Sequence, residues 1–203
     1  MITKKLARVM RYLRSTLSMP NTLEADDTDI LNWWVDASYA VHPDMKGHTG
    51  GALSMGKGVI YGTSTRQKLV TRSSTEAELV GIHDVLPQIL WTRHFLESQG
   101  YHVIDSLLHQ DNKSTILLAA NGRASSSRRT RHIHLRNFFV HDKLDNKDLS
   151  IQHCPTDMMT SDYYSKPLQG SLFRRHRNDI MNYIDSPTTS SELVNHKSVL
   201  GVT

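Results

Sequence analysis

Four acidic positions along the chain have the character of metal-binding carboxylates. Asp36 lies within the apolar stretch WWVDAS, Asp111 ends the apolar stretch LLHQD, and Asp162 opens the last helical segment. The fourth position is one of two glutamates, Glu76 and Glu78, at the start of a long amphipathic segment in SSTEAELVGI. Acids at strand ends and helix starts can converge on one edge of a sheet although they lie far apart in the sequence. We therefore expect a shared cluster of carboxylates.

Such a cluster suits divalent cations. Clustered carboxylates repel one another and raise one another's pKa, and they are tolerated where divalent cations neutralise them. Four carboxylate donors suit Mg²⁺, which keeps several waters and prefers carboxylate and phosphate ligands. Two ions about 3.5–4 Å apart would clamp the attacking and leaving oxygens of a phosphodiester. The four acidic positions therefore lead to the hypothesis of a two-metal site.

Purely structural roles for the same acids stay open at this point. Asp36 and Asp111 fit strand-end residues that form Asx turns. Asp162 with Ser161 fits the N-terminal cap of a helix. The spacing of the acids does not separate these roles from a metal site.

The two neighbouring glutamates are distinguishable by helix geometry. Ser73 and Glu76 have the spacing of a capping box, in which Ser73 is the N-cap and Glu76 reaches back to its backbone N–H. Glu78 lies about 200° further round the helix, so it faces away from the cap and is free for chemistry. Thr75 and Glu78 also fit a capping box, so this assignment of Glu78 is a preference.

The elements that must position these acids follow from hydrophobic periodicity and turn residues. A helix from about 74 to 98 is expected to be kinked or interrupted at Pro87 and to be followed by a C′ residue at Gly100. The full expected order is strands 33–40, 50–55 and 58–65 with a turn at 56–58, helix 74–98, strand 106–111, helices 113–122 and 133–144, strand 149–154, and a broken helix pair over 161–184. This βββ-α-β-α-α-β-α order predicts an α/β fold with a mixed sheet flanked by helices.

Three regions are expected along the chain. Residues 1–30 form a basic amphipathic helix and an acidic linker, 31–184 form one folded domain, and 185–203 form a polar tail that we expect to be disordered. The favoured interpretation of the helix is that its apolar face docks on a neighbouring domain. Alternatives are an acidic, membrane or nucleic-acid partner, or a transit peptide.

Composition limits the class of protein. The formal net charge of +4 is a weak indication of a polyanionic partner, and the single cysteine excludes an internal disulfide, which fits a reducing compartment. No apolar run reaches the ~18 residues of a membrane span, so no membrane partner is expected.

The basic loop GRASSSRRTRH has two interpretations. Its Arg128, Arg129 and Arg131 bind phosphate oxygens, or it is simply a solvated loop.

Several blocks together resemble a known family. In order they are WVDAS, TGGALSMGKG, SSTEAEL, QDNKSTILLAANG, RTRHIHLRNFFVHDKL and CPTDMMTSDYYSKPLQG. From Trp33 to about Met181 they resemble the ribonuclease H domain of copia-type long-terminal-repeat retrotransposon polyproteins. The stretch KKLARVMRYLRST is similar to the segment that joins the reverse transcriptase to this domain in such polyproteins.

The resemblance implies a fold, an activity and a site. The fold is the ribonuclease H fold, a five-stranded mixed sheet with flanking helices. The activity is Mg²⁺-dependent hydrolysis of the RNA strand of an RNA–DNA hybrid, with Mn²⁺ as a possible substitute and a 5′-phosphate and a 3′-hydroxyl as products. The acidic set of the family carries over to Asp36, Glu78, Asp111 and Asp162, and its glutamate directly precedes a leucine, which selects Glu78 over Glu76.

Roles and partners follow from the same resemblance. Asp36 is expected to bridge two ions, Glu78 and Asp111 to hold the ion on the leaving-group side, and Asp162 to hold the ion that activates water. Ser74 and Thr75, just before Glu78, are candidate contacts to the sugar edge of the substrate, although a capping role is the stronger expectation. The implied partners are an RNA–DNA hybrid and the reverse transcriptase domain of the same element. The implied location is the cytoplasm, including virus-like particles, with access to the nucleus.

The sequence departs from the family pattern around the last acid. Thr160-Ser161 and Ser165-Lys166 replace the usual small apolar pair and Phe-Thr-Lys, which bears on local packing. The sequence has no Tyr-x-Asp-Asp motif, so no polymerase activity is expected of this chain, which has the character of a fragment of a degraded or split element. The main alternative function is a catalytically weak relic that binds nucleic acid or packs on a polymerase. A nuclease or integrase of the same fold is a second alternative.

Overall fold

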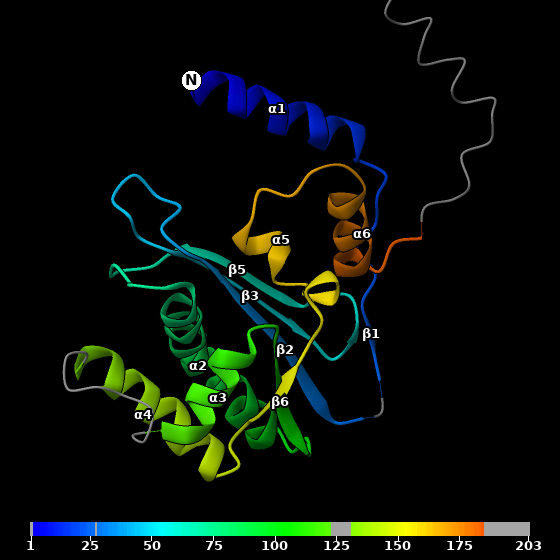
Figure 1. Ribbon diagram of the computed structural model, residues 1–203. Coiled ribbons are helices and arrows are strands. Elements are labelled where there is room, and N and C mark those ends of the chain that lie inside the picture. Colours follow the sequence, from blue (N-terminus) through cyan, green and yellow to red (C-terminus); the bar gives the residue numbers. More distant parts are fainter. Residues whose placement is uncertain (1, 27, 123–130, 185–203) are drawn as a thin grey trace, which may run out of the picture.

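The computed structural model describes residues 2–26, 28–122 and 131–184, and its centre is a five-stranded sheet of order β5-β3-β2-β6-β7. The strands are β2 (Ile30–Ser38), β3 (His48–Ser54), β5 (Tyr61–Arg66), β6 (Asp105–Gln110) and β7 (Ser150–His153). β5, β3 and β2 are antiparallel neighbours, whereas β2, β6 and β7 run parallel. This mixed sheet with flanking helices confirms the predicted fold class (Figure 1).

β2 is the central strand of the sheet, and its alternating side chains bury one of its faces. Leu31, Trp33 and Val35 are buried on one face of the strand, where they pack against the long helix α2 (Ser74–Ser98). Because β2 and β6 are parallel, their carboxyl ends meet at the same edge of the sheet. Asp36 lies near the end of β2 and Asp111 directly follows β6, so the topology brings these two acids to one edge.

The helices form two layers around the sheet. α2, α3 (Lys113–Asn121) and α4 (Arg131–Asp145) lie on one side, and α5 (Asp162–Ser165) and α6 (Gly170–Met181) lie on the other (Figure 1). A short 3-10 turn, Thr156–Met158, leads from β7 towards α5. Seven of the largest buried side chains come from β2, β6 and α2: Leu31, Trp33, Leu79, Ile82, Leu86, Ile89 and Leu108.

The structure corrects two local predictions in part, since α2 is not interrupted at Pro87 and residues 56–58 are not only a turn. α2 runs without interruption through Pro87, because Val85, Leu86 and Ile89 on either side of the proline are buried and hold both halves against the core. The segment 56–58, predicted as a turn, contains the short strand β4 (Gly56–Lys57). β4 pairs with β1 (Glu24–Ala25), which lies in the predicted linker. Gly100 follows α2 with a positive φ of 87°, as expected of a C′ residue.

The predicted N-terminal helix is present as α1 (Ile2–Ser15), and most of its apolar side chains are exposed. Its Tyr12 ring meets Phe173 of α6 edge-on, with 5.7 Å between ring centroids. Its apolar side chains are at least half exposed: Leu6, Val9, Met10 and Leu13. Docking on a neighbouring domain therefore stays a prediction. Among the described helices, none combines the length and apolar character that crossing a lipid bilayer requires. The predicted tail, 185–203, lies outside the described residues.

Candidate metal centre

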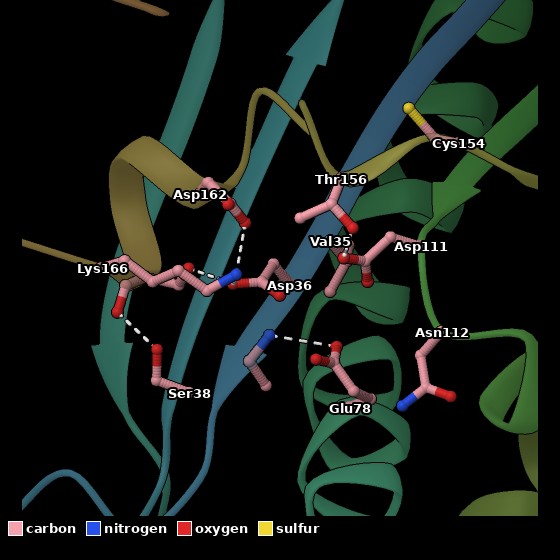
Figure 2. Close-up of polar contacts among 12 residues, drawn as sticks. Val35, Asp36, Ser38, Glu78, Asp111, Asn112, Cys154, Thr156, Asp162 and Lys166 are labelled. Carbon is pink, nitrogen blue, oxygen red and sulfur yellow. Dashed lines mark hydrogen bonds and ion pairs between the residues drawn. The ribbon is translucent and has the colours of Figure 1, made fainter. Parts of the chain in front are cut away.

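Three of the predicted acids converge at the carboxyl ends of β2 and β6. Asp36, Glu78 and Asp111 each offer a carboxylate oxygen, and these oxygens all lie within 4.8 Å of one another. They come from a strand, from the second turn of α2 and from the turn after β6, and Figure 2 shows them facing a common space. Asp36 and Glu78 are buried and Asp111 is partly exposed, so the cluster opens to solvent on the side of Asp111.

Glu78 is held by two donors inside the protein. Its Oε2 accepts a hydrogen bond from the backbone N–H of Ala37 at 3.0 Å and another from Gln110 Nε2 at 3.2 Å. Burial, and then the nearby charge of Asp36, raise the pKa of Glu78 to about 9. Near neutral pH and without a cation, Glu78 is therefore protonated.

Asp162 lies on the other side of Asp36 and is paired with a lysine. Lys166 Nζ lies 2.7 Å from Asp162 Oδ1 and 3.3 Å from Asp36 Oδ2 (Figure 2). Asp36 Oδ2 also accepts a hydrogen bond from Ser165 Oγ. Burial raises the pKa of Asp162 to about 6, although its hydrogen bond with Lys166 works in the opposite direction. The three-carboxylate cluster does not include Asp162, which instead shares the ammonium group with Asp36.

Asp111 does not form the Asx turn considered for it, and Asp162 and Ser161 do not form the considered helix cap. Asp111 Oδ2 accepts a hydrogen bond from Thr156 Oγ1 at 2.9 Å, while the neighbouring Asn112 caps α3 by accepting from Ser114 and Thr115 N–H. Ser161 makes no capping hydrogen bond to α5. The capping duty near Asp111 thus falls to Asn112, and the acid is left facing the cluster.

The two glutamates of SSTEAEL separate as predicted, with one difference in detail. Ser73 is the N-cap of α2 and accepts from Glu76 N–H at 3.2 Å. Glu76 Oε2 accepts from the backbone N–H of Arg72 at 2.7 Å, rather than from that of Ser73. Glu76 therefore stabilises the start of the helix, and Glu78 lies in the acidic cluster.

The predicted nucleic-acid contacts are only partly visible. Ser74 is exposed and Thr75 is half-buried at the start of α2, one turn before Glu78. Arg128 and Arg129 lie outside the described residues, as does the side chain of Arg131. Their contact with substrate stays a prediction.

The donor set of the cluster fits a divalent cation. Three carboxylates in one space supply the hard oxygen ligands that such ions take, and one partly exposed side leaves room for water or phosphate oxygens. Burial raises the pKa of Glu78 most, and the nearby charge of Asp36 adds to it; a bound cation would offset both effects by favouring the ionised carboxylate.

Sequence reasoning missed two residues that contact the cluster. In the sequence, Lys166 stands out only in the departure from the family pattern around Asp162, and Gln110 only within the stretches LLHQD and QDNKSTILLAANG. One signal was available for Gln110: it shares the inward face of β6 with Ser106 and Leu108, and a polar side chain there needs buried partners.

Comparison with known proteins places the chain among retrotransposon polyproteins. No protein-family model matches it. It is 28% identical over 166 residues to the retrovirus-related Pol polyprotein from transposon TNT 1-94 of Nicotiana tabacum, and 30% identical over 171 residues to that from transposon RE2 of Arabidopsis thaliana. These matches cover 81% and 83% of this chain but 12% of each relative. The chain is thus homologous to one segment of these much longer polyproteins.

Solved structures with a similar backbone include ribonucleases H. LC11-RNase H1, isolated from compost, matches with a TM-score of 0.48 and 11% identity over 66% of this chain and 91% of its own. The prototype foamy virus protease–reverse transcriptase matches with a TM-score of 0.40 and 14% identity over 74% of this chain and 19% of its own. At these identities, the function of the chain rests on its own site.

Proposed function

We propose that this segment of a retrotransposon Pol polyprotein is a Mg²⁺-dependent endonuclease that hydrolyses the RNA strand of RNA–DNA hybrids. The observation that carries the proposal is the convergence of Asp36, Glu78 and Asp111 within 4.8 Å at the carboxyl ends of two parallel strands. The names of the relatives support the retroelement context.

Each acid has a proposed role. Asp36, Glu78 and Asp111 would hold one divalent ion, and Asp36 with Asp162 would hold a second. Such ions supply a Lewis acid for the phosphodiester and lower the pKa of a bound water. The protein orients its ligands through Ser165, which donates to Asp36, and through Ala37 N–H, which donates to Glu78.

The partners and regions of the chain belong to the same proposal. Residues 31–184 form the nuclease unit, and 1–30 connect it to a reverse transcriptase domain, whose surface would cover the exposed apolar face of α1. The substrate is an RNA–DNA hybrid formed during reverse transcription, in the cytoplasm or in virus-like particles.

The test is cleavage of an RNA–DNA hybrid labelled on the RNA strand, with Mg²⁺, by the full chain and its variants. Asp111→Asn and Glu78→Gln should abolish cutting because each removes a ligand charge. Glu76→Gln is the matched control, since Glu76 has the same side chain two residues away, hydrogen-bonds at the helix cap and is not a member of the three-carboxylate cluster.

Each outcome decides between the alternatives. Cutting that survives Glu78→Gln but not Glu76→Gln would overturn the assignment of the pair. A folded wild-type chain that binds the hybrid without cutting it would favour the binding relic over the nuclease.

A further inference from the structure

Gln110 is completely buried at the end of β6, and its side-chain amide makes three hydrogen bonds. Its Nε2 donates to Glu78 Oε2 at 3.2 Å and to the backbone carbonyl of Val35 at 3.3 Å. Its Oε1 accepts from the backbone N–H of Asn112 at 2.9 Å. The reverse orientation of the amide would place its oxygen against two acceptors, so this orientation is the one that satisfies every partner.

Each of these bonds holds either a member of the acidic cluster or the residue next to one in the chain. The bond to Glu78 fixes a carboxylate directly. Val35 immediately precedes Asp36, and Asn112 immediately follows Asp111, so the other two bonds fix the backbone on which those acids stand. One amide therefore links β2, α2 and the turn after β6 where all three carboxylates meet.

We propose that Gln110 is a positioning residue that sets the spacing of Asp36, Glu78 and Asp111 for a divalent ion. The inference rests on the proposed metal centre. A ligand that must rotate or shift to reach an ion weakens binding, and residues that orient metal ligands typically change metal affinity by about 10–100-fold when they are replaced.

Gln67 offers a matched control in the same fold. It is also a buried glutamine, and its Nε2 donates to Thr49 Oγ1 at 3.1 Å and to the carbonyl of Ala77 at 2.8 Å. Within the described residues, its side-chain hydrogen bonds go to a hydroxyl and a backbone carbonyl, and none goes to a carboxylate of the cluster. Replacing Gln67 thus costs buried hydrogen bonds, as replacing Gln110 does. Ala77 immediately precedes Glu78, but its backbone is already held inside α2, so the loss of this one bond leaves the Glu78 carboxylate with both of its own donors.

The experiment measures Mn²⁺ binding to the metal-free full chain by titration calorimetry at one pH. Gln110→Met and Gln67→Met keep the side-chain length and remove the amide. Gln110→Asn is a milder second variant, whose shorter amide cannot span Glu78 and the Asn112 backbone together. Circular dichroism melting establishes that each variant is folded and how far its stability has fallen.

The expected result is that Mn²⁺ binds Gln110→Met about 10–100-fold more weakly than wild type, with Gln110→Asn between them, while Gln67→Met keeps the wild-type affinity at a comparable loss of stability. Equal affinity in wild type and both Gln110 variants would overturn the inference, as would an equal weakening in Gln110→Met and Gln67→Met. Absence of Mn²⁺ binding by the wild-type chain would instead overturn the metal centre itself, and the positioning role with it.

Discussion

Lys166 holds Asp162 across one turn of α5, with 2.7 Å between Nζ and Oδ1, and the same ammonium lies 3.3 Å from Asp36 Oδ2. Two buried carboxylates thus share one positive charge. Burial of the amine opposes its charge, yet Asp36 and Asp162 raise the pKa of Lys166. The lysine offsets repulsion in the half of the site that the three-carboxylate cluster does not cover.

Removal of this charge should raise the pKa of Asp162. Burial already brings it to about 6 against the pull of the lysine, so Lys166→Gln is expected to move the titration midpoint of Asp162 above that value. The midpoint is measured by NMR titration of the carboxyl carbon in the metal-free chain. Lys57→Gln is the control, because Lys57 pairs with Glu24 in the small β1–β4 sheet. An unchanged midpoint in Lys166→Gln would show that the ion pair does not form in solution.

Glu78 should make the metal-free protein less stable as pH rises. Burial and Asp36 raise its pKa from 4.5 to about 9, so between these values the folded chain keeps a proton that the unfolded chain releases. One such proton lowers the free energy of unfolding by up to about 1.4 kcal/mol per pH unit as pH rises through this window. Glu78→Gln lacks this term, so its stability relative to wild type should increase from pH 5 to pH 8 in urea denaturation. A pH-independent difference between the two proteins would contradict the buried, protonated glutamate.

Metal binding should release the same proton. An ion needs the ionised carboxylate, so Mg²⁺ binding near pH 7 is expected to release about one proton from Glu78 and to strengthen as pH rises towards 9. Calorimetry in two buffers of different ionisation enthalpy counts the protons. Glu76→Gln should release as many protons as wild type, and Glu78→Gln fewer. Binding heats that do not depend on the buffer would count against Glu78 as a ligand.

Local signals in the sequence predicted the parts of the site that depend on neighbouring residues. The assignment of Glu76 to the cap of α2 required only the three-residue spacing from Ser73, and the structure confirms that Ser73 caps Glu76 N–H. The apolar stretch around Asp36 predicted the strand that carries this acid. The choice of Glu78 from helix rotation and from the family pattern agrees with its place in the cluster.

Contacts between distant segments could not be predicted in the same way. Gln110 meets Val35 and Glu78 across 75 and 32 residues, and Lys166 meets Asp36 only because α5 packs beside β2. The β1–β4 pair joins two polar segments without hydrophobic alternation, so periodicity carries no signal for it. Tertiary packing also overrides local preference at Pro87, where a buried stripe keeps the helix continuous.

The close packing of α5 on the sheet should depend on the absence of a side chain at Gly50. Gly50 lies opposite Asp36 in the β2–β3 register, and a Cβ there would come within 2.6 Å of Ser161 O and 2.7 Å of Ser165 N. Both are backbone atoms, so Gly50→Ala must push α5 away from β3. Overpacking of this kind typically costs about 1–3 kcal/mol. The displaced helix also carries Asp162, so hybrid cleavage should fall together with stability in urea denaturation.

Gly81→Ala is the matched control for this displacement. The nearest atoms that its added Cβ would meet outside the helix are side-chain carbons, the closest at 3.3 Å, and alanine is favoured over glycine by up to about 1 kcal/mol inside a helix. Gly81→Ala should therefore lose less stability than Gly50→Ala and keep hybrid cleavage. If Gly50→Ala instead matched wild type in both stability and cleavage, close packing of α5 on β3 would not be what positions Asp162 beside Asp36.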